Sequence, residues 1–167
     1  MSKTSKVVGG FVTGLMALSV VFAGATAAQA ATPRPEIAVS TSTGVGDRGF
    51  VVQNDGNTTI PAGTQFKFHS NKALSVGLFG DQQLNEDWNI ALAGSGYDAT
   101  VILYEPLLPG QSKKFLLSTV EVSAFSQYSL ELSDPDTALI DTNYYNNKAG
   151  MRCTVVVFGL PACSATR

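Results

Sequence analysis

The stretch GFVVQNDGNTTIPAGTQFKFHS, residues 49–70, contains strand-forming segments on both sides of a loop rich in turn residues. Residues 50–52 are Phe-Val-Val, and QFKF at 65–68 alternates polar and apolar side chains with the period of a half-buried strand. The residues between them include Asn, Asp, Gly and Pro, which favour turns. We therefore predict a β-hairpin here, with Gly56 in a left-handed conformation.

The rest of the chain repeats this alternation of short strand-forming runs and turns. Further strands are predicted at residues 36–43, 74–79, 88–92, 97–104, 112–122, 127–134 and 151–158. No sustained i, i+3, i+4, i+7 apolar pattern, as expected of a helix, follows the signal segment described below. The fold predicted for residues 31–167 is all-β, a single immunoglobulin-like antiparallel β-sandwich domain of seven to nine strands.

Residues 1–30 have the organisation of a secretory signal peptide. Lys3 and Lys6 precede an apolar core that runs to about Ala25, and Ala28 and Ala30 occupy the positions that signal peptidase reads. A transmembrane anchor is the alternative, but glycines and hydroxyl residues interrupt the apolar segment. We expect cleavage after Ala30 and a secreted, extracellular protein, released from the membrane, for which cell-wall association is also considered.

Composition limits the partners of the exported chain. Loss of residues 1–30 leaves 137 of 167 residues, with 9 basic and 13 acidic side chains and a net charge of −4. Such a surface repels phosphate, so nucleic acid is excluded as a partner.

Two cysteines, Cys153 and Cys163, lie near the C-terminus of the sequence. In an exported chain, a pair with no odd partner predicts a disulfide. A redox pair normally has CxxC spacing, and a metal site needs two further ligands, so these alternatives are less consistent with the pattern.

The order of turns and strands resembles a known family. An N-x-G turn follows the second strand, a Pro-Gly turn precedes a later strand, and an acidic loop ending in paired asparagines precedes the last one. These positions are Asn54 and Gly56, Pro109 and Gly110, Asp134 and Asp136, and Asn146 and Asn147. Over nearly all of residues 31–167 the chain is similar to the cell-adhesion-related domains found in bacteria (CARDB-like) and to related conserved-repeat modules of bacterial surface proteins. The resemblance implies an immunoglobulin-like fold and a role in cell adhesion, although this chain has one copy and an added cysteine loop.

The acidic loop is the candidate metal site. Asp134, Asp136, Asp141 and Asn143 offer the hard oxygen ligands that calcium prefers. The alternative interpretation, which we favour, assigns these residues to turns, because the spacing lacks the order of a known calcium loop. We therefore expect no cofactor.

Aromatic residues are the candidate binding surface. Tyr144 and Tyr145 are adjacent, so in an extended loop they point in opposite directions and one is exposed. Trp88 is a further candidate for binding, but a single Trp in a sandwich more often belongs to the core.

The sequence offers little support for catalysis. His69 is the only histidine, and no GxSxG nucleophile motif occurs, although Ser and Asp residues for a Ser–His–Asp arrangement are available. We predict a secreted bacterial non-enzymatic module that binds an extracellular protein or a cell-wall polysaccharide. The alternatives are a small-molecule carrier or inhibitor on the same sandwich and, third, a hydrolase.

The signal peptide yields the first testable prediction. Mass spectrometry of the exported protein should find Ala31 at its N-terminus, because Ala28 and Ala30 present the small side chains that the peptidase requires. An intact Met1 on protein recovered from the medium would contradict it.

Overall fold

The computed structural model describes residues 32–44, 47–79, 85–118, 125–133, 141, 143–155 and 161–166. The predicted signal peptide, Asp134 and Asp136 lie outside these ranges. The described residues belong to one compact unit.

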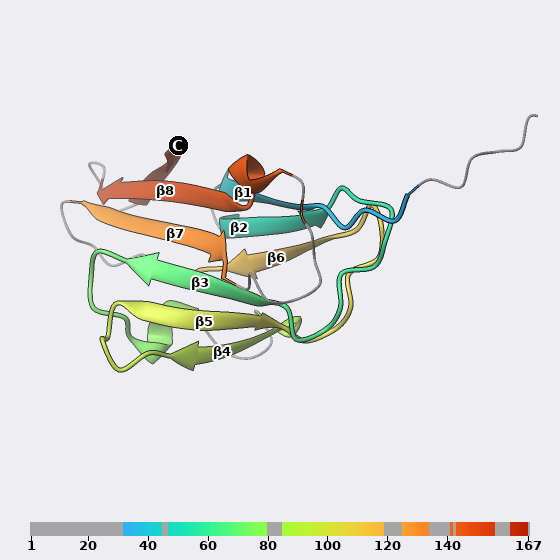
Figure 1. The fold of residues 1–167 in the computed structure, drawn as a ribbon. Helices are drawn as coiled ribbons and strands as arrows, with labels where there is room; N and C mark the ends of the chain where they lie inside the picture. Colours follow the sequence, from blue (N-terminus) through green and yellow to red (C-terminus); the bar gives the residue numbers. More distant parts are fainter. Residues whose placement is uncertain are drawn as a thin grey trace, which may run out of the picture. The chain divides into compact units, whose positions relative to one another are not determined.

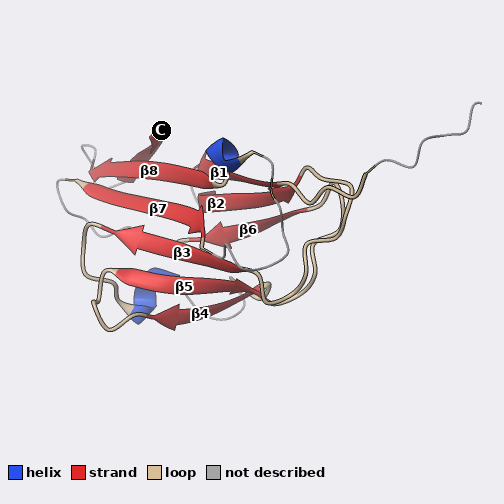
Figure 2. Cartoon of the chain, in the orientation of Figure 1, coloured by secondary structure: helices blue, strands red, loops and turns tan. Residues whose placement is uncertain are grey.

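The described chain forms two antiparallel sheets, shown in Figures 1 and 2. The strands are β1 (Ile37–Gly44), β2 (Asp47–Asn54), β3 (Gln65–Ser70), β4 (Trp88–Leu92), β5 (Asp98–Leu103), β6 (Ser112–Leu116), β7 (Ser126–Leu132), β8 (Lys148–Val155) and β9 (Pro161–Thr166). One sheet has the order β1-β2-β6 and the other has the order β4-β5-β3-β7-β8-β9. The prediction of an all-β sandwich with seven to nine strands is confirmed.

The predicted hairpin over residues 49–70 is wrong. Its two strands exist, but β2 pairs with β1 and β6, whereas β3 pairs with β5 and β7 in the other sheet. Phe50 and Phe68 are both fully buried, and their ring centroids lie 6.1 Å apart. The two segments therefore face each other across the core, and the loop between them crosses from one sheet to the other.

Two further elements differ from the sequence prediction. Residues Val76–Phe79 form a short 3-10 helix, η1, in place of a strand, and its Leu78 and Phe79 are buried. Strand β9 was not predicted, because PACSAT has few strong strand formers. A second 3-10 helix, η2 (Tyr144–Asn146), precedes β8.

Strand β3 shows how the core sets the exposed surface. Phe66 and Phe68 are fully buried, whereas the alternate residues Lys67 and His69 are exposed. Successive side chains of a strand point to opposite faces. The aromatic core therefore directs Lys67 and His69 to the outer, solvent-facing side of the six-stranded sheet.

The disulfide between Cys153 and Cys163 is confirmed, and it joins β8 to β9. The two residues are direct partners in the antiparallel register. Strand β9 is the outermost strand of its sheet, so the bridge fastens an edge strand. Closing a loop of this size stabilises the fold by about 2.5–3 kcal/mol in the chain-entropy model.

Gly56 is not left-handed, contrary to the prediction, since the positive-φ glycines are Gly49, Gly63, Gly96 and Gly110. A glycine is required here because residues 34–36, the leader segment that precedes β1, approach position 56 closely. A Cβ at this position would overlap the carbonyl oxygen of Arg34 and lie 2.6 Å from the amide nitrogen of Glu36.

Replacing Gly56 should therefore separate the leader from the loop. Gly56→Ala should lower the free energy of unfolding by about 1–3 kcal/mol, because two backbone segments must move apart. Thermal or urea unfolding measures this change.

Gly63 provides the matched control, since it has a φ of +87° and open space where a side chain would project. Gly63→Asn should cost less than about 1 kcal/mol, because Asn tolerates left-handed backbone. Parent-like unfolding of Gly56→Ala would refute the close packing of the leader.

Candidate functional site

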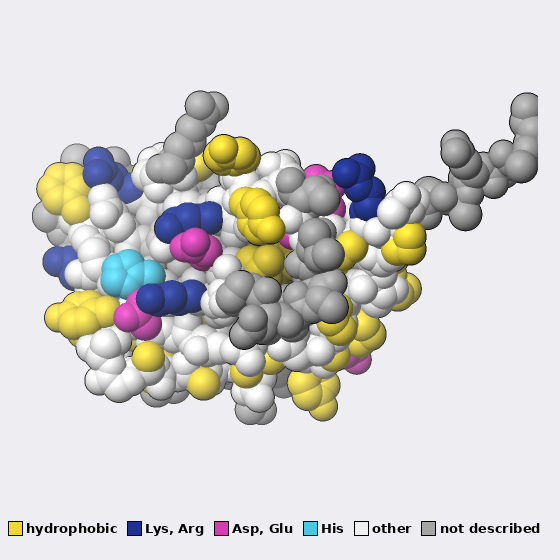
Figure 3. All heavy atoms as spheres, in the orientation of Figure 1, with side chains coloured by type: hydrophobic (Ala, Val, Ile, Leu, Met, Phe, Trp, Pro, Cys, Tyr) yellow, Lys and Arg dark blue, Asp and Glu magenta, His cyan; other side chains and the backbone are white. Residues whose placement is uncertain are grey.

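Polar and charged side chains gather on the outer face of the six-stranded sheet. Figure 3 shows basic, acidic and histidine side chains over β3, β7 and β8 on this face. They come from strand positions that alternate with the core residues. The chemistry of this face is thus a consequence of the strand register.

The register places five residues, each from a different strand, in one row. Asp98 on β5 pairs with His69 on β3, which pairs with Ser129 on β7. Ser129 pairs with Gly150 on β8, and Gly150 pairs with Thr166 on β9. Residues from widely separated parts of the chain therefore form a continuous strip across the sheet.

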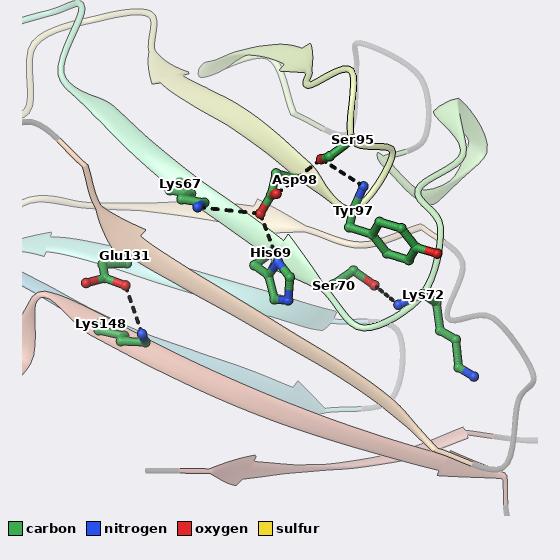
Figure 4. Close-up of polar contacts among 9 residues, drawn as sticks. All are labelled: Lys67, His69, Ser70, Lys72, Ser95, Tyr97, Asp98, Glu131 and Lys148. Atoms are coloured by element: carbon green, nitrogen blue, oxygen red, sulfur yellow. Dashed lines mark hydrogen bonds and ion pairs between the residues drawn. The ribbon is translucent and has the colours of Figure 1, made fainter.

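His69 and Asp98 form the closest polar pair of this row. The Nδ1 of His69 donates to Oδ1 of Asp98 at 2.8 Å, and Lys67 Nζ lies 3.8 Å from the same oxygen (Figure 4). Ser95 Oγ donates to the other carboxylate oxygen at 3.1 Å. The hydrogen bond from His69, with smaller contributions from Ser95 and the charge of Lys67, lowers the pKa of Asp98. The Asp98 carboxylate therefore stays ionised, and each of its two oxygens accepts a hydrogen bond.

These contacts do not assemble a Ser–His–Asp triad. Ser95 donates to Asp98, and no hydrogen bond joins Ser129 to His69 although the two are register partners. Within the described part of the chain, no serine hydroxyl is hydrogen-bonded to the imidazole. The arrangement orients His69 and leaves its Nε2 facing away from Asp98.

Two further pairs lie on the same face. Lys148 Nζ donates to Glu131 Oε2 at 2.8 Å (Figure 4). When the amide of Gln127 is oriented with its oxygen toward Arg152, that oxygen accepts from Nε at 3.2 Å and from Nη2 at 2.8 Å. Lys148 thus has a charged partner and Arg152 a neutral one.

A groove of about 850 Å³ extends from this face to β1 of the three-stranded sheet, which contributes Ser40 and Thr41. Its lining includes His69, Ser129, Tyr145, Lys148, Gly150 and Arg152, and β9 contributes Ala165 and Thr166. No acidic side chain is found among the lining residues that the structure describes. The groove therefore combines hydrogen-bonding groups, basic side chains and one exposed tyrosine, Tyr145, since its other tyrosine, Tyr128, is buried.

The candidate aromatic residues have different environments. Tyr144 and Tyr145, in η2, are 75% and 98% exposed. Trp88 is buried, and its Nε1 donates to the carbonyl oxygen of Lys114 at 2.7 Å. Trp88 therefore belongs to the core, the interpretation that we favoured, and not to a binding surface, whereas Tyr145 lies at the groove.

In the described part of the acidic loop, the Asp141 carboxylate accepts hydrogen bonds from backbone amides. The buried Asp141 accepts from the amide nitrogen of Ile37 at 2.8 Å through Oδ2 and from that of Asn143 at 2.8 Å through Oδ1. Asp141 therefore fixes the start of β1 to the loop. The described residues contain no cluster of three His, Cys, Asp or Glu side chains placed to hold a metal ion.

The chain matches no family model, no curated protein and no solved structure. The similarity to bacterial cell-adhesion-related domains therefore remains a prediction. Among the described residues, no helix combines the length and apolar character needed to cross a bilayer.

Sequence patterns selected Tyr144 and Tyr145 for binding but not His69, Arg152 or Ser129. Arg152 and Ser129 carry no motif, and only strand register places them beside the groove.

The environment of Asp141 yields a prediction about calcium. Both carboxylate oxygens accept backbone hydrogen bonds, so millimolar calcium should not change the melting temperature relative to chelator. A site of micromolar affinity would instead stabilise the protein by about 4 kcal/mol. Such a rise would contradict the turn interpretation.

The same contacts predict a structural effect of Asp141→Asn. The amide supplies one acceptor where two backbone donors need one each, so the variant should lose about 1–3 kcal/mol of stability, with or without calcium. Unfolding curves in both conditions check this.

Proposed function

We propose that residues 31–167 form a secreted bacterial binding module that recognises a cell-wall polysaccharide through the groove on the outer face. The observation that carries this proposal is the position of Tyr145, a residue that is 98% exposed at the edge of a polar groove. An aromatic ring gains nothing for the fold when it is left in water. It offers a flat apolar surface on which a sugar ring can stack.

The other groove residues suit the hydroxyl groups of a sugar. His69, Ser129 and Arg152 present donors and acceptors on a surface that is open to solvent. A protein partner of ordinary affinity would need about 800 Å² of well-packed surface with an apolar centre. The polar character of the groove therefore favours a glycan over a protein.

The core gives less support to a small-molecule carrier. Such a protein would hold its ligand between the sheets, but there the rings of Phe66, Phe68, Phe115 and Trp88 pack against one another with centroids 5.7–6.0 Å apart. The disulfide is compatible with an extracellular location.

Tyr145→Ala should weaken binding to purified bacterial cell-wall polysaccharide by about tenfold, because the stacking surface is lost. Retention of the protein on the insoluble polysaccharide, measured over a range of concentrations, gives the change in apparent Kd.

Tyr104→Ala is the matched control, since Tyr104 is 68% exposed but does not line the groove. It should bind like the parent. Equal loss in both variants, or no retention of the parent, would overturn the proposal. If the parent retains a protein and not the polysaccharide, the proposal is overturned in favour of protein recognition.

A further inference from the structure

The charge of the groove is opposite to that of the protein. After removal of residues 1–30 the chain has a net charge of −4. The ionisable residues that line the groove include His69, Lys148 and Arg152, and the described lining contains no carboxylate. A basic groove in an acidic protein gives a local attraction for anions that the whole surface does not share.

Two carboxylates on this face, among the residues that the structure describes, are paired with other side chains. Asp98 is held by His69, Lys67 and Ser95, and Glu131 by Lys148. The charge of Lys148 is therefore largely balanced on the protein itself.

Arg152 differs because its partner carries no charge. The oxygen of Gln127 accepts from Nε and from one hydrogen of Nη2. A guanidinium has five N–H donors, so three remain that no described side chain engages. Two of those donors lie on the Nη1–Nη2 edge, which binds a carboxylate through two parallel hydrogen bonds. Gln127 thus orients the fork of N–H groups on the Arg152 guanidinium without neutralising its positive charge.

Gly150 lies between Lys148 and Arg152 on β8 and is covered by the Thr166 side chain of β9. Lys148, Gly150 and Arg152 alternate along β8, so all three face the outer side of the sheet. A Cβ at position 150 would collide with Thr166 Oγ1, the register partner on β9.

We infer that the groove binds sugars that carry a carboxylate, and that the carboxylate binds to the free edge of the Arg152 guanidinium. This inference rests on the proposed glycan-binding function and adds the chemical class of the sugar. Arg152 is the residue that distinguishes an acidic sugar from a neutral one.

The test compares one polysaccharide in two chemical states. Acidic cell-wall polysaccharide is used as isolated and after carbodiimide–borohydride treatment, which reduces its carboxylates to alcohols and leaves the ring structure intact. The exported protein should bind the native polymer about tenfold more tightly than the reduced one, and this advantage should shrink as salt is raised.

Arg152→Gln should remove the preference for the native polymer and leave binding to the reduced polymer within twofold of the parent. Arg152→Lys should retain part of the preference, because a point charge replaces the fork. Lys67→Gln is the control: it removes the same charge from the same sheet face, outside the groove, and should keep the full preference. Unfolding curves establish that each variant is folded.

The outcomes separate the two proposals. Equal binding of native and reduced polymer, or a preference that survives Arg152→Gln, overturns the carboxylate inference and leaves glycan binding in place. Binding that depends on Arg152 but resists carboxylate reduction also overturns it and indicates phosphate groups. No binding of either polymer overturns the proposed function itself.

Discussion

The direction of the Phe68 side chain is the constraint on which the rest of the structure depends. Its ring centroid lies 6.1 Å from that of Phe50 and 5.7 Å from that of Phe115, so one residue of the six-stranded sheet contacts two strands of the other sheet. Because side chains alternate along β3, burial of Phe68 leaves Lys67 and His69 in solvent. A register slip of one residue would bury His69 and expose Phe68, which would remove the core and the polar face together.

Sequence periodicity predicted most strands but could not assign their partners. The alternation in residues 65–68 indicates which side of the strand is buried, and it is the same whether the partner strand comes before or after it in the sequence. The hairpin prediction failed for this reason: β2 and β3 are adjacent in sequence and belong to different sheets. The glycine at position 56 was noticed, but its cause was misassigned, because the proximity of Arg34 is a tertiary contact.

The candidate site shows the same division between local and long-range information. The aromatic pair Tyr144 and Tyr145 could be selected by residue type, since the exposed position of a loop tyrosine follows from local geometry. The row formed by Asp98, His69 and Ser129 could not, because two separate strand registers bring these residues together. The role of Asp141 also required the structure, because the sequence does not show that its carboxylate oxygens accept hydrogen bonds from backbone amides.

The disulfide connects the fold to the groove. Strand β9 supplies one wall of the groove and has β8 as its neighbour, so in this sheet it is held from one side. An edge strand of this kind frays easily, because it has few buried apolar contacts and pairs along a single edge. The bridge from Cys153 to Cys163 lies three residues from Thr166, the register partner of Gly150. By restraining β9, the disulfide holds this wall in place in the free protein, which would lower the entropy lost on binding of the glycan that we propose. In an exported protein this covalent restraint persists, and it provides a preformed surface that the few apolar residues of β9 would not maintain alone.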